Sequence, residues 1–149
     1  MRVDRSKLSS RDRLITGGAL VAFIAAFLPW WGVQSGFGGF GGYNLSVDGW
    51  QAGFTAWAGS LLLTAAGAYV MLRRSDSGIP APSFGEARLV LALAGLGLIL
   101  VVIRWLSLPS YQGIGVGTRY GIWIALVAGA IETVAAIDEA RSPSPTATG

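Results

Sequence analysis

Four long apolar segments, separated by short polar or glycine-rich stretches, constrain the fold of this chain most. They run from about residues 14 to 31, 53 to 72, 87 to 108 and 118 to 137. At about 1.5 Å per residue, each forms a helix of roughly 27 to 33 Å, which matches a hydrocarbon core of about 30 Å. With 52% hydrophobic and 13% charged residues, the composition is not that of a water-soluble domain. The sequence therefore predicts an all-α, polytopic membrane protein, an antiparallel bundle of four transmembrane helices.

The flanking segments complete the expected domain organisation. Residues 1–13 are predicted to be a basic cytoplasmic segment, residues 14–138 the transmembrane domain, and residues 139–149 a disordered cytoplasmic tail. The first apolar segment ends in PWW and is followed by no small-residue cleavage site. We therefore expect it to be retained as a helix rather than removed as a signal peptide.

Lysine and arginine predict the orientation. Five lie before the first segment, Arg73, Arg74 and Arg88 lie between the second and third, and Arg141 follows the fourth. Only Arg104 and Arg119 flank the opposite side. Because short cytoplasmic loops carry the excess of basic residues, both termini are expected in the cytoplasm, in a multi-pass protein of the plasma (inner) membrane.

The sequence contains neither cysteine nor histidine. Their absence removes the Ser-His and Cys-His pairs of nucleophilic catalysis and the commonest soft metal ligands. The runs GFGGFGG and GIGVG lack the preceding strand, the following helix and the lysine of a phosphate-binding loop. We expect no enzyme activity, no cofactor, no metal and no nucleic-acid partner.

Two charged side chains are predicted at membrane depth, where a charge costs about 2.5 to 3.5 kcal/mol. They are Glu132 in the fourth segment and Arg104 in the third. By depth, Arg88 is the expected partner of Glu132 and Asp48 that of Arg104, while Arg119 also lies on the outer side. Snorkelling beside such a partner is the simpler interpretation. The alternative is that both charges line a pore.

Aromatic residues gather toward the outer ends of the predicted helices. The set comprises Trp30, Trp31, Trp50, Trp57, Trp105, Tyr111, Tyr120 and Trp123. Aromatic belts normally mark both membrane interfaces, so this one-sided set has two interpretations. It is an outer belt, or it is a docking surface for a partner's helix or a lipid-like ligand.

Small residues recur every four positions in the fourth segment. They are Gly121, Ala125, Gly129 and Thr133. Such a stripe permits close approach of another helix, and it predicts a packing face.

Three short motifs carry a resemblance to known sequences: FLPWW at the end of the first segment, DGW before the second, and RYGIW at the start of the fourth. Together with the basic N-terminus and the glycine-rich outer loop, they resemble small uncharacterised four-helix membrane proteins of actinobacteria. The resemblance implies the four-helix fold and no particular activity.

The functional expectation follows from these features together. We expect a non-enzymatic accessory or scaffold subunit of a cell-envelope membrane complex, surrounded by lipid and in contact with other membrane proteins or with copies of itself. The alternative is an oligomeric channel or small-solute transporter that uses Glu132 and Arg104.

Overall fold

A computed structural model describes residues 8–34, 44–75, 78–108 and 115–142. This part of the chain is mostly helical. Its helices are α1 (Ser10–Ala25), α2 (Phe54–Arg74), α3 (Glu86–Leu106) and α4 (Tyr120–Arg141). The expectation of four helices is confirmed. Of these, α2, α3 and α4 are long and apolar enough to cross a membrane, whereas α1 has only 16 residues.

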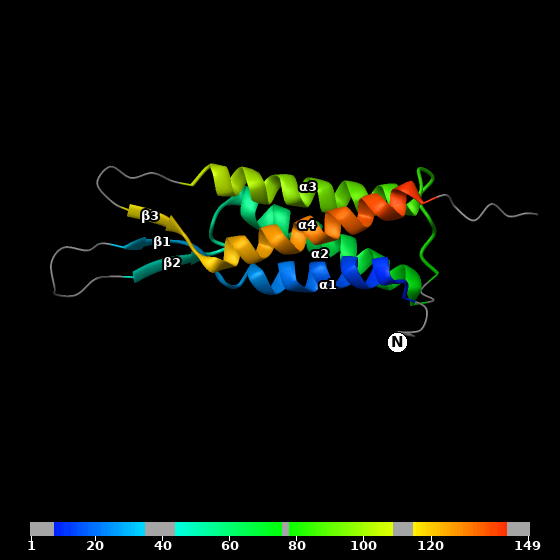
Figure 1. The fold of residues 1–149 in the computed structure, drawn as a ribbon, viewed down its shortest axis with the longest axis horizontal. Coiled ribbons are helices and arrows are strands. Elements are labelled where there is room, and N and C mark those ends of the chain that lie inside the picture. The colour runs from blue at the N-terminus through cyan, green and yellow to red at the C-terminus, as the bar shows by residue number, and fades with distance from the viewer. Residues whose placement is uncertain (1–7, 35–43, 76–77, 109–114, 143–149) are drawn as a thin grey trace, which may run out of the picture.

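The helices lie side by side, and a small sheet extends from one end of them (Figure 1). α1 packs against α2 and α4, and α3 packs against the same two helices. Successive helices run in opposite directions, so the start of α1 and the end of α4 lie at the same end. We call this the terminal end and the opposite one the sheet end.

Contacts along α1 and α4 fix their mutual register. Three pairs face each other: Arg11 with Glu139, Gly18 with Glu132, and Pro29 with Gly121. From one pair to the next, the residue number in the first segment rises by 7 and then 11, and the number in α4 falls by the same amounts. The two segments therefore match in length from the terminal end to the sheet end.

Glycines allow the other helices to approach closely. A Cβ atom added at Gly67 of α2 would lie 2.2 Å from the Cβ of Ala19 in α1. Between α2 and α3, a Cβ at Gly59 or Gly97 would lie 2.9 or 3.0 Å from the other residue's carbonyl oxygen. These distances leave no room for a side chain, and they show that small residues set the helix spacing.

The sheet contains β1 (Pro29–Gln34), β2 (Asn44–Asp48) and β3 (Gly115–Thr118), all antiparallel, in the order β2-β1-β3. Pro29 disfavours continuation of α1 because it lacks an N–H donor, and the following tryptophans and valine favour a strand. The predicted boundaries 14–31 are therefore wrong: α1 begins at Ser10 and ends at Ala25. Hydropathy alone cannot separate a short apolar strand from the end of a helix, which is why the all-helical prediction omits the sheet.

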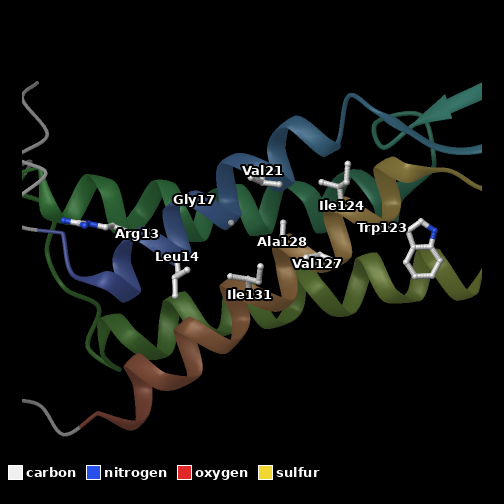
Figure 2. A pocket seen from close by; sticks show the side chains of 10 residues that line it. Arg13, Leu14, Gly17, Val21, Trp123, Ile124, Val127, Ala128 and Ile131 are labelled. Atoms are coloured by element: carbon white, nitrogen blue, oxygen red, sulfur yellow. The ribbon is translucent and has the colours of Figure 1, made fainter.

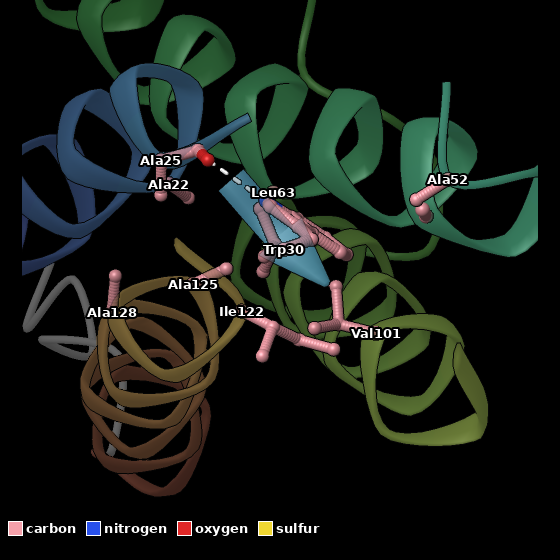
Figure 3. Packing of buried hydrophobic residues seen from close by; sticks show 10 residues of the cluster. Ala22, Ala25, Trp30, Ala52, Leu63, Val101, Ile122, Ala125 and Ala128 are labelled. Carbon is pink, nitrogen blue, oxygen red and sulfur yellow. Dashed lines mark hydrogen bonds between the residues drawn. The ribbon is translucent and has the colours of Figure 1, made fainter. Parts of the chain in front are cut away.

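Trp30 joins the sheet to the helices. Its side chain is fully buried at the sheet end among Ala22, Leu63, Val101 and other small or branched residues (Figure 3). The indole Nε1 donates a hydrogen bond to the carbonyl oxygen of Ala25 at 2.8 Å. A second apolar cluster, which includes Ile15 and Val90, fills the terminal end.

Candidate functional site

Asp12 is the most constrained charged group at the terminal end. Ser9 caps α1: its hydroxyl accepts from the Asp12 amide at 3.1 Å, and the Asp12 carboxylate accepts from the Ser9 amide at 3.0 Å. The same carboxylate accepts from Arg74 of α2 at 3.1 and 3.3 Å. Asp12 is only 3% exposed, so this ion pair is partly shielded from water.

Further ion pairs connect the remaining helices at this end. Glu86 of α3 pairs with Arg73 at 3.2 Å and with Arg74 at 3.9 Å. Arg11 of α1 pairs with Asp138 and Glu139 of α4. Hydrogen bonds that Arg11 donates to Glu139 and then to Asp138 raise the pKa of Arg11 above its usual value, so its charge persists at any physiological pH. All four helices are thus linked.

A polar cavity of about 740 Å³ opens among these pairs. Its charged lining residues are Arg11, Asp12, Arg74, Glu86, Arg88 and Glu139. Cationic and anionic side chains are equal in number there, so the cavity has no excess charge with which to select an ion. Arg88 is exposed and forms no ion pair with any described residue. The geometry of the cavity therefore supports a structural role, in which the ion pairs hold the ends of the four helices together.

Glu132 lies deeper than expected and without its expected partner. Its side chain is fully buried and faces Gly18 of α1, and neither carboxylate oxygen has a hydrogen-bond partner among the described residues. The expected Arg88 pair is therefore wrong. The physical reason is helix length: α4 continues to Arg141, beyond the predicted boundary at residue 137. Glu132 is consequently about 14 Å from the helix end.

The expected pair of Arg104 with Asp48 is also not formed. Asp48 accepts a hydrogen bond from the amide of Gln51 at 2.9 Å, in the turn after β2. The Arg104 guanidinium carbon lies 6.0 Å from the centre of the Trp31 ring, and its Nη1 donates to the carbonyl of Ser107 at 3.4 Å. A cation over an aromatic face is a favourable alternative to an ion pair.

Arg119 lies just before α4. Its amide donates to the carbonyl oxygen of Trp30 at 2.8 Å, and its guanidinium lies against Gly32 of β1. It therefore helps to hold the central strand to the start of α4.

The expected aromatic surface is divided between interior and exterior. Trp30 is fully buried and unavailable for docking, because Gly49 and Gly121 approach its ring too closely for any side chain to fit between them. Tyr120 and Trp123 are exposed, while Trp105 packs edge to face on Trp123 with 5.4 Å between ring centres.

The three other tryptophans differ in exposure. Trp31 and Trp50 are partly buried, and Trp57 is exposed and stacks edge to face on Phe54 at 5.0 Å between ring centres. Tyr111 lies outside the described residues. The rings that remain accessible are therefore distributed around the helices rather than on one face.

The small-residue stripe of α4 lies at helix contacts. Gly121, Ala125 and Gly129 are buried, and Gly129 faces Leu63 of α2 and Leu98 of α3. Thr133 is partly buried, and its hydroxyl donates to the Gly129 carbonyl oxygen at 2.7 Å. These residues pack the helices of this chain together, so they offer no free seam for a partner.

Sequence reasoning missed Asp12 and Gly67. The signal for Asp12 was present, since a serine followed three residues later by an acidic residue is a capping box that marks a helix start. Gly67 has no comparable signal, because its role depends on the position of Ala19 in another helix.

Among the described residues, no group of three or more acidic side chains could hold a metal ion.

A scan against models of protein families finds no match for this chain, and searches of curated proteins and of solved structures find none either.

Proposed function

We propose that the chain is a multi-pass protein of the plasma (inner) membrane that crosses the bilayer four times as an antiparallel bundle, with both termini in the cytoplasm. Within the membrane it acts as a non-enzymatic accessory subunit of a cell-envelope complex. The sheet end then lies outside the cell.

The match between α1 and α4 supports a crossing by the short α1. Residues 11 to 29 run alongside residues 139 to 121 of α4. That stretch of α4 measures about 27 Å, close to the thickness of a hydrocarbon core of about 30 Å. α1 and the turn that follows it therefore reach as deep as a helix that is long and apolar enough to cross.

The accessory role rests on the sheet. β2 and β3 are its edge strands, each paired with β1 on one side only among the described strands. Leu45 on β2 is 67% exposed, and an exposed strand edge is a ready template for an added strand from a partner. Because Trp30 anchors β1 in the helical core, the edge is held rigidly.

The test is the size of the protein extracted from its native membrane. In gentle detergent and at native abundance, we expect the wild type to elute in a complex larger than the chain and Leu45→Arg to lose that complex. Phe84→Arg, at another exposed apolar residue but at the terminal end (53% exposed), is the control and should keep it. A wild type that elutes as a lone monomer contradicts the proposal.

The alternative, an oligomeric channel that uses Glu132 and Arg104, has less support. Glu132 is buried inside a single chain, and Trp30 occupies the sheet end of the helices. Glu132 could not line a pore between copies unless the helices repacked.

A further inference from the structure

α1 carries two apolar grooves on its outer surface, one on each side of the same two residues. The groove between α1 and α4 has a volume of about 480 Å³, and the second, which extends from α1 to Met71 of α2, about 660 Å³. Arg13 and Gly17 line both of them. These volumes fall within the range of roughly 300 to 1,000 Å³ typical of ligand sites.

The first groove runs along most of the helix. Figure 2 shows Arg13 at one end and Trp123 at the other, with Leu14, Val21 and Val127 between them. Apart from Arg13 and the Trp123 indole, the side chains that line it carry no polar atom. A molecule bound in this groove should therefore be apolar along the groove, with its polar or charged group near Arg13.

Gly17 makes the two grooves continuous. A Cβ atom added at Gly17 would meet no heavy atom within 4 Å, so the surface of α1 is low at this point. A larger side chain there would form a ridge between the grooves. A molecule with two apolar chains joined at one polar group could therefore straddle α1 here.

Charge identifies the polar group. Arg13 is exposed at the terminal end and lines both grooves. Basic residues between transmembrane helices on the cytoplasmic side bind anionic lipid headgroups, and each contributes about 1 kcal/mol near the surface. The arginine supplies the cationic site, and the grooves supply the apolar surface for two chains.

We propose that α1 binds one anionic diacyl phospholipid of the cytoplasmic leaflet, with its phosphate at Arg13 and one acyl chain in each groove on either side of Gly17. This inference rests on the proposed membrane placement. It is independent of any partner at the sheet end.

The test is lipid binding to the purified, delipidated protein, measured by native mass spectrometry in mild detergent. With phosphatidylglycerol and phosphatidylcholine added together, we expect phosphatidylglycerol to be preferred by about fivefold, the ratio that one arginine contact provides. Arg13→Gln should remove the preference. Gly17→Leu should reduce phosphatidylglycerol binding severalfold while the protein remains folded, because its side chain points into open space.

Matched controls separate a site from general charge and surface effects. Arg88→Gln removes another exposed arginine of the terminal end, and Gly95→Leu fills a comparably open position on α3; both should bind like the wild type. Lysophosphatidylglycerol, with one chain, should bind more weakly than the diacyl lipid. Equal binding of the two phospholipids, equal effects of the control variants, or equal binding of the one-chain lipid would overturn the proposal.

A separate measurement decides whether the membrane placement itself fails: the side of the membrane from which a maleimide labels Leu45→Cys and Phe84→Cys. If those residues are correctly placed and phosphatidylglycerol is not preferred, only the lipid site is wrong.

Discussion

At the scale of single residues, the ion pair with the most buried carboxylate is that of Asp12 with Arg74. Asp12→Asn keeps an oxygen that can accept a hydrogen bond from the Ser9 amide, but it removes the negative charge that pairs with Arg74. We expect the free energy of unfolding in detergent to fall by about 1 to 2 kcal/mol, less than for a fully buried pair because Arg74 is partly exposed.

Asp138→Asn is the matched control for Asp12. Asp138 pairs with Arg11, but its side chain is 61% exposed, so solvent already screens that pair. Thermal unfolding should show a clearly smaller change than for Asp12→Asn. Equal changes would mean that burial does not govern the strength of these pairs.

For Glu132, in contrast to Asp12, we expect that removing the charge does not lower the stability. Its buried carboxylate oxygens have no hydrogen-bond partner among the described residues, and an unpaired charge at membrane depth is costly. Glu132→Gln, which is nearly isosteric, should therefore leave the free energy of unfolding unchanged or raise it by up to about 3 kcal/mol. A marked loss of stability would reveal an acid-specific partner, supplied by another chain or by a described residue after rearrangement.

At the scale of elements, helix spacing depends on glycines. Gly67→Ala would place a Cβ atom 2.2 Å from that of Ala19, so α1 and α2 would have to separate. We expect a loss of about 1 to 3 kcal/mol. The measurement is unfolding of both single variants and of the double variant Gly67→Ala with Ala19→Gly.

The double variant restores the space, so the two changes should couple favourably by at least about 1 kcal/mol. Gly95→Ala is the control, because nothing lies within 4 Å of a Cβ atom there. It should be neutral or slightly stabilising. Additive effects at Gly67 and Ala19 would show that the two helices do not touch as described.

At this scale, the sequence predicts those features that a single segment determines and misses those that depend on contacts between segments. The number of helices follows from apolar length, which each segment carries in itself. The sheet does not, because Pro29 to Trp31 look like the end of an apolar helix until they pair with β2 and β3. The predicted partners of Glu132 and Arg104 are wrong for a related reason. The position of a residue on one segment gives neither the true end of its helix, as for Glu132, nor the side chains that neighbouring elements bring close, as for Arg104 beside Trp31.

At the scale of the whole molecule, the two ends differ in chemistry. The terminal end is bound by ion pairs that link all four helices, and the sheet end is bound by Trp30 and its apolar neighbours. Among the described residues, basic side chains lie mainly at the first and aromatic side chains mainly at the second. The proposed membrane orientation, the partner at the sheet and the lipid at Arg13 all depend on this polarity.

The sidedness of two positions tests that account most directly. The chain has no cysteine, so Leu45→Cys on β2 and Phe84→Cys before α3 each introduce a single thiol at an exposed residue. In intact cells, a membrane-impermeant maleimide should label Leu45→Cys, and it should label Phe84→Cys only after the membrane is permeabilised. Labelling of both positions from the same side of the membrane would contradict the account.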